Sequence, residues 1–225
     1  MSARFYVCFL GVGPGLESVE LPTRRLDMSY SILGAGAIGF ALATQFSRKH
    51  VDVLVASTRG PASLAEKLTV LGPCVAPASI SEAIGQDIII LAIPFSAVAE
   101  TGARLPDWRR RVIIDATNAL SFPSFKRLDL GGRRSTDVVA ESFPGAGIVK
   151  AFNTLPAAML GEPPQTKGGR RVIFLSGDDP SANSKVADLI ERLGYAALDL
   201  GRLADAAPLQ EFGGALMVKN LARVE

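Results

Sequence analysis

The stretch "SILGAGAIGFALATQFSRKHVDVLVASTRG", residues 31–60, decides the fold because it contains three closely spaced glycines. Gly34, Gly36 and Gly39 form a G-x-G-x-x-G pattern between an apolar run and a segment with helical character. In such a strand–turn–helix unit, the first glycine permits the tight turn and the second lets a diphosphate approach the backbone. The third lets the helix pack close to the sheet. The pattern predicts a dinucleotide site, and a purely structural turn is the alternative interpretation.

The second apolar run ends differently from an NAD-binding strand. Such strands usually end in Asp or Glu, which holds the ribose 2′-hydroxyl group, about 20 residues after the glycines. Here Ser57, Thr58 and Arg59 stand at that place. A carboxylate would repel a 2′-phosphate, whereas hydroxyl groups and a guanidinium group can bind it through charge-assisted hydrogen bonds. The sequence therefore predicts NADP as the cofactor, with an ordinary exposed arginine as the alternative.

Short apolar runs alternate with helical patterns along the rest of the chain. The runs are nearly continuous in Ile, Val, Leu and Ala, as in parallel strands that are covered on both faces. Ser79 and Glu82 have the spacing of a capping box, and Asp179-Pro180 and Gly194 mark the two ends of a later helix. The alternation predicts an α/β fold with a doubly wound, mostly parallel sheet of Rossmann-like type. The predicted strands are residues 30–33, 51–56, 87–93, 112–115, 148–152, 172–176 and 196–200, and residues 121–135 form the one long predicted loop.

Further residues of interest follow the later strands. Pro94 and Phe95 close the run at 87–93, Asn118 follows the run at 112–115, and Asn153 follows the run at 148–152. Ligands of doubly wound sheets bind beyond the carboxyl ends of the strands, so we expect these residues beside the cofactor. A structural cap is the alternative for Asn118.

Composition and charge exclude several other functions. The net charge of +2 is too small to indicate nucleic acid or an anionic membrane as a partner. No apolar run approaches the ~20 residues of a membrane-spanning helix. Cys8 and Cys74 have neither disulfide-framework nor metal-ligand spacing, so we expect a cytoplasmic protein without a metal site. The one histidine, His50, lies in a predicted turn, and no catalytic acid or base is predicted.

The motifs GAGAIG, STR, AIPF, DATN and VKAFNT, followed by RRVIFLSGDD, resemble the NADP-dependent deazaflavin (coenzyme F420) oxidoreductase family. The cytosolic domain of ferric-reducing membrane proteins is a relative of that family. The resemblance covers residues 28 to about 200 and implies hydride transfer between NADPH and a deazaflavin, in a homodimer. It implies that the glycine loop holds the diphosphate, that STR holds the 2′-phosphate and that the later motifs line the nicotinamide. The cofactor-binding residues so expected are Gly34, Ala35, Gly36, Ala37, Ile38, Gly39, Ser57, Thr58, Arg59, Ala92, Ile93, Pro94, Phe95, Asn118, Phe152 and Asn153.

The chain is expected to divide into three parts. Residues 1–27 are expected to be a disordered N-terminal extension or the result of a mis-assigned start, because we take Met28 as the natural start. Residues 28–200 form the NADP-binding domain, and residues 201–225 form a short segment that packs on it. Family members that act on a deazaflavin usually have a longer helical C-terminus. The acceptor site is therefore expected to be incomplete, completed by a second subunit, or adapted to another acceptor.

The sequence favours an NADPH-dependent oxidoreductase that transfers a hydride between NADP(H) and a small-molecule acceptor. The preferred acceptor is a deazaflavin or a flavin-like compound. Two alternatives remain open, a ferric or quinone-type reductase that uses free flavin and a non-catalytic NADPH-binding redox sensor.

Overall fold

The computed structural model describes residues 28–121 and 123–224. The expected extension at residues 1–27, and with it the choice of Met28 as the natural start, lies outside the described residues. The division of the chain at residue 200 stays a prediction.

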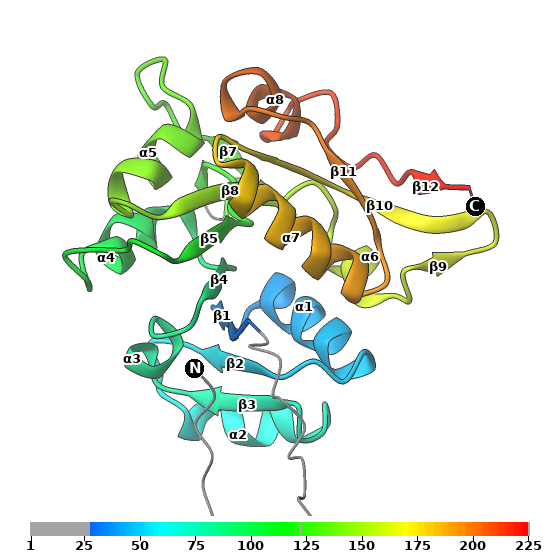
Figure 1. The fold of residues 1–225 in the computed structure, drawn as a ribbon. Helices are drawn as coiled ribbons and strands as arrows, with labels where there is room; N and C mark the ends of the chain where they lie inside the picture. The colour runs from blue at the N-terminus through cyan, green and yellow to red at the C-terminus, as the bar shows by residue number, and fades with distance from the viewer. Residues whose placement is uncertain (1–27, 122, 225) are drawn as a thin grey trace, which may run out of the picture.

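One twisted sheet forms the centre of the molecule, with the strand order β11-β10-β8-β5-β4-β1-β2-β3 (Figure 1). The strands from β3 to β8 along this order are parallel, β10 is antiparallel to β8, and β11 is parallel to β10. This confirms the predicted α/β, Rossmann-like fold with a mostly parallel sheet. The bounds are β1 (Tyr30–Leu33), β2 (Val53–Ala56), β3 (Val75–Ala78), β4 (Ile88–Leu91), β5 (Val112–Asp115), β8 (Gly147–Ala151), β10 (Gly169–Gly177) and β11 (Ala196–Asp199).

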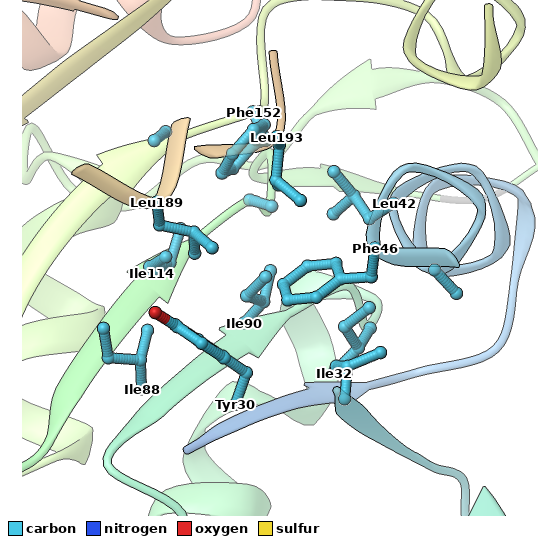
Figure 2. Close-up of a cluster of buried hydrophobic side chains, with 14 of the residues drawn as sticks. Tyr30, Ile32, Leu42, Phe46, Ile88, Ile90, Ile114, Phe152, Leu189 and Leu193 are labelled. Atoms are coloured by element: carbon cyan, nitrogen blue, oxygen red, sulfur yellow. The ribbon is translucent and has the colours of Figure 1, made fainter. Parts of the chain in front are cut away.

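Helices cover both faces of the sheet. On one face, α1, α2, α6 and α7 contribute to a first core, and Figure 2 shows Phe46 of α1 and Leu189 of α7 directed toward the strands. On the other face, α3, α4, α5 and α8 contribute to a second core. The bounds are α1 (Ala37–Arg48), α2 (Ala62–Thr69), α3 (Ile80–Ala83), α4 (Val98–Gly102), α5 (Ser135–Ser142), α6 (Ala157–Gly161), α7 (Pro180–Arg192) and α8 (Leu203–Gln210), with a 3-10 turn η1 (Phe95–Ala97) before α4. None of the helices in the described ranges combines the length and the apolar character that crossing a membrane requires.

Each of the seven predicted strands is present, with ends that differ from the prediction by at most three residues. The capping box of Ser79 and Glu82 and the Asp179 cap of α7 are also present. The segment at residues 121–135 is not a simple loop, because β6 (Leu120–Ser121) and β7 (Lys126–Arg127) pair as a hairpin. Two further short strands, β9 (Gln165–Thr166) and β12 (Ala222–Arg223), pair with the first residues of β10.

The two edges of the main sheet differ from its interior. Strand β3, which the sequence analysis missed, contains Pro77 and lies at one edge. Proline has no backbone N–H group, so it is tolerated in an edge strand. At the other edge, the N–H group of Ala197 in β11 donates a hydrogen bond to Glu191 Oε1 at 3.0 Å. A side chain thus occupies a donor that an incoming strand would use.

Helix α1 lies against the end of β1 without space for a side chain between them. A Cβ atom at Gly39 would lie 1.9 Å from the carbonyl oxygen of Gly34, which is far inside contact distance. Gly34 itself has a φ of +106°, which favours glycine. Gly36, between them, faces open space, because a Cβ atom there would have no heavy atom within 4 Å. The three glycines therefore meet three different requirements.

We predict that Gly39→Ala lowers the free energy of unfolding by about 1–3 kcal/mol or more, because the added carbon forces α1 away from β1. Gly36→Ala is the matched control, and it should cost less than about 1 kcal/mol, since only the helix cap changes. Urea denaturation followed by circular dichroism measures both values. Equal losses of stability in the two variants would contradict the prediction.

Candidate functional site

All five predicted motifs lie along the edge of the sheet that is formed by the carboxyl ends of its parallel strands. Strands β8, β5, β4, β1 and β2 are neighbours and parallel, so their carboxyl ends point the same way. The motif residues follow these ends directly: Gly34–Gly39 after β1, residues 57–59 after β2, residues 92–95 after β4, Asn118 after β5, and residues 152–153 after β8. The structure therefore brings together in space the segments that the sequence analysis selected.

The glycine loop is tied to the strands on both of its sides. The N–H group of Gly34 donates to the carbonyl oxygen of Ala56 at 2.8 Å, and the N–H group of Ala92 donates to the carbonyl oxygen of Leu33 at 2.8 Å. A Cβ atom at Gly34 would lie 2.2 Å from Ala92 O. These contacts fix the loop between the ends of β2 and β4, and they leave no room for any other residue type at position 34.

The N-terminus of α1 is suited to an anion. Gly36 is the N-cap of α1 and has no side chain to bond the free N–H groups. The first turn of α1 contains no acidic residue. The backbone N–H groups at the start of a helix have no intrahelical partners, and the helix dipole is positive there. The open space beside Gly36 lets a phosphate group come close to the backbone. The residues present therefore fit the diphosphate of a dinucleotide.

A lysine that the sequence analysis did not select adds positive charge beside this loop. Lys67 Nζ of α2 donates a hydrogen bond to Ala35 O at 2.8 Å and lies 4.9 Å from the centre of the Phe40 ring. Nothing in the sequence distinguishes this lysine from other exposed lysines of an amphipathic helix. Its place beside the glycine loop follows from the packing of α2.

The end of β2 fits a further phosphate group. Ser57 Oγ is buried and is among the side-chain atoms of the described residues that lack a hydrogen-bond partner. Thr58 and Arg59 are exposed beside it. An unpaired buried hydroxyl group is unfavourable, and a phosphate oxygen would accept its hydrogen bond. Assignment of these three residues to a 2′-phosphate remains a prediction.

Two of the expected cofactor residues direct their side chains into the protein. Phe95 is 7% exposed and belongs to the second core, and Phe152 is 1% exposed and belongs to the first. Only their backbone groups reach the sheet edge. Phe152 has a φ of +62°, which is rare for a bulky residue and common at functional sites.

Two asparagines link the ends of β5 and β8. Asn118 Nδ2 donates to Asn153 O at 3.0 Å, and Asn153 Nδ2 donates to Asn118 Oδ1 at 3.2 Å. Asn153 Nδ2 also donates to the carbonyl oxygen of Gln210 at 2.7 Å. The pair joins two segments that are 35 residues apart in the chain. Asn118 is thus a structural link between two loops, and its contact with a cofactor stays a prediction.

The segment after residue 200 packs directly against this edge, which the sequence analysis could not place. Gln210 is fully buried, accepts a hydrogen bond from Ser176 Oγ and donates to Lys150 O at 3.3 Å. Glu211 Oε1 accepts hydrogen bonds from the N–H group and the hydroxyl group of Ser135, at 2.8 and 2.9 Å. Helix α8 thus forms one side of the site. No local sequence signal marks these two residues.

The residues that the sequence analysis selected can bind and orient a ligand, and none of them is His, Asp, Glu, Lys, Tyr or Cys. Among the residues that the sequence analysis selected at the five strand ends, Arg59 is the only one with a charged side chain. His50 lies in the turn between α1 and β2 and is exposed. Hydride transfer needs proximity and orientation more than an acid or a base. The site is therefore consistent with a redox reaction at a bound dinucleotide.

Comparison with known proteins identifies similar chains. Residues 29–119 match the model of the family described as NADP oxidoreductase coenzyme F420-dependent. A hypothetical protein of Sinorhizobium meliloti, of known crystal structure, is 46% identical, with a TM-score of 0.84 over 87% of this chain and 96% of that one. A reductive aminase from Aspergillus terreus, solved with NADPH, is 26% identical, with a TM-score of 0.57 over 80% of this chain and 56% of that one. The metalloreductase STEAP3 of Rattus norvegicus is 28% identical over 181 residues, which are 80% of this chain and 35% of that protein. The chain thus spans about a third of the metalloreductase.

We predict that Arg59→Ala weakens NADPH binding about tenfold or more and leaves NADH binding nearly unchanged. One charge-assisted hydrogen bond contributes about 1.5–3 kcal/mol, and NADH has no 2′-phosphate to receive it. Isothermal titration calorimetry measures both dissociation constants. Arg192→Ala, an exposed arginine in the last turn of α7, is the control and should change neither. Equal losses for both cofactors would refute the assignment of Arg59.

Proposed function

Because this chain belongs to the family described as NADP oxidoreductase coenzyme F420-dependent, we propose that it transfers a hydride between NADP(H) and a deazaflavin or flavin-like acceptor. The observation that carries the proposal is the row of motifs at one sheet edge. A bare glycine loop, a helix N-terminus, an unpaired serine hydroxyl and an arginine lie there in the order that NADP requires.

The residues of this edge have distinct roles in the proposal. The backbone of Gly34–Gly39 holds the diphosphate, and Ser57, Thr58 and Arg59 hold the 2′-phosphate. The backbone of residues 92–95 and 152–153, with Asn118, lines the nicotinamide end. When bound, NADPH supplies the hydride. The protein supplies orientation, and the buried strand ends behind the site exclude water from that side.

The acceptor belongs to a restricted chemical class. A ketone or imine acceptor requires a proton at the atom next to the one that receives the hydride, and enzymes supply it from a positioned side chain. The selected strand-end residues include no such acid or base. A deazaflavin or flavin ring accepts the hydride without a proton from a protein side chain, so this class fits the site best.

A second candidate function has support from one relative. The chain is 28% identical to a protein named a metalloreductase. On this basis, a reductase that passes electrons from NADPH through free flavin to a ferric or quinone acceptor is the alternative. A homodimer and a cytoplasmic location stay predictions.

We predict that the purified protein oxidises NADPH when a deazaflavin is added, and that the fall in dihydronicotinamide absorbance measures the rate. Flavin mononucleotide, a ferric chelate and a quinone, each tested alone and with free flavin, complete the panel. The Arg59→Ala variant should raise the KM for NADPH in the same assay, since it acts on cofactor binding.

The panel separates the proposals. Turnover with a ferric chelate or a quinone only in the presence of free flavin would favour the alternative reductase. Tight NADPH binding without turnover on any acceptor would overturn both reductase proposals and favour a redox sensor. Absence of NADPH binding would refute the cofactor site itself.

A further inference from the structure

A buried ion pair lies next to the two asparagines of the site. Asp115 of β5 and Lys150 of β8 are register partners in the parallel ladder, and Lys150 Nζ lies 2.9 Å from Asp115 Oδ2. Both side chains are fully buried. Removing two charges from water is costly, and well-packed apolar side chains of similar volume often stabilise a core as well or better. Stability alone therefore does not account for a charged pair at this position.

The pair fixes the chain that leaves β5. Asp115 Oδ1 accepts hydrogen bonds from the N–H group of Thr117 at 2.9 Å and from its hydroxyl group at 2.6 Å. Lys150 Nζ donates a further hydrogen bond to Thr117 O at 3.3 Å. Three hydrogen bonds to the pair thus hold Thr117, the residue before Asn118. The position of Asn118 follows from them.

The backbone of Lys150 connects to the chain that leaves β8. Lys150 O accepts a hydrogen bond from Gln210 Nε2 at 3.3 Å, and Gln210 O accepts one from Asn153 Nδ2 at 2.7 Å. Asn153 and Asn118 then exchange two hydrogen bonds. The side chains of the pair therefore hold Thr117, and the next residue, Asn118, is bonded to Asn153, which Gln210 links to the Lys150 backbone.

The backbone near this network is strained. Phe152, two residues after Lys150, has a φ of +62°, although its side chain is packed in the first core. A bulky residue keeps a left-handed conformation only when its surroundings hold it, and such strain is concentrated at functional sites. Anchors on both sides, at Lys150 and at Asn153, meet this condition.

We propose that Asp115 and Lys150 are positioning residues. Together they set the relative places of the strand-end segments 116–118 and 152–154, and so the orientation of the nicotinamide end of NADP(H), without touching the cofactor. This inference rests on the proposed function, because it requires a cofactor at this edge of the sheet.

Two double variants of the full chain test the inference. Asp115→Val with Lys150→Met removes both charges and the hydrogen bonds, and leaves no buried charge unpaired. Asp115→Asn with Lys150→Gln is the matched control, since its amide groups can rebuild the hydrogen bonds without charge. Hydrogen exchange in the ligand-free protein and calorimetry with adenosine 2′,5′-bisphosphate and with NADPH are measured for the parent and for both variants.

The apolar double variant should expose the loops selectively. We expect the amide of Thr117 to exchange about tenfold faster, while the amides of Ile113 and Val149 inside β5 and β8 keep their parent rates. Binding of adenosine 2′,5′-bisphosphate should stay within about twofold of the parent, because that fragment occupies the distant β1–β2 end. NADPH binding should weaken about fivefold or more, since only NADPH reaches the loops. The amide double variant should resemble the parent in all three measurements.

Other outcomes overturn the inference. Unchanged exchange at Thr117 and unchanged NADPH binding in the apolar variant would show that the pair has no positioning role. Equal acceleration of exchange inside the strands would show that it only stabilises the fold. If the apolar variant does not fold, Thr117→Val decides, because it deletes one hydrogen bond to Asp115 and leaves the pair intact. Unchanged NADPH binding in that variant overturns the inference too. Failure of the parent to bind either ligand would instead refute the proposed function.

Discussion

Helix α1 can approach the end of strand β1 only because position 39 carries no side chain. The carbonyl oxygen of Gly34 occupies the place that a Cβ atom of Gly39 would need. This approach puts the free N–H groups of the first helical turn directly beyond β1, in the middle of the parallel strands. Without it, the first turn of α1 would lie farther from the glycine loop, which hydrogen bonds hold between the ends of β2 and β4.

The parallel strands extend this arrangement along one edge. Each strand is followed by one short motif, and the order of the strands places the glycine loop and residues 57–59 on one side and the asparagine pair on the other. The buried side chains of the parallel strands are uncharged at β1 and β4, whereas β5 and β8 carry the buried charges of Asp115 and Lys150. The buried charges thus lie beneath the asparagine pair and not beneath the glycine loop.

The sequence predicted the parts of the molecule whose requirements are local. The glycine spacing, the apolar runs and the cap residues each depend on neighbours within one strand or turn, so seven strands and the start of α1 were found. Strand β3 was missed because Pro77 argues against a strand, except at an edge, and edges are not visible in a sequence. Gln210, Lys67 and the Asp115–Lys150 pair were missed because their partners are distant in the chain. The five motifs lie together in space as predicted. The side chains of Phe95 and Phe152 point inward, because each packs in one of the two apolar cores.

Both borders of the sheet are closed to further growth. Pro77 offers no donor on β3, and the carboxylate of Glu191 already holds the Ala197 donor on β11. A strand from a neighbouring molecule would therefore find an interrupted ladder on either side. A protein with a long run of exposed apolar β-sequence risks fibrillar self-association during synthesis and storage. These two features leave an added strand fewer backbone partners at either side of the sheet.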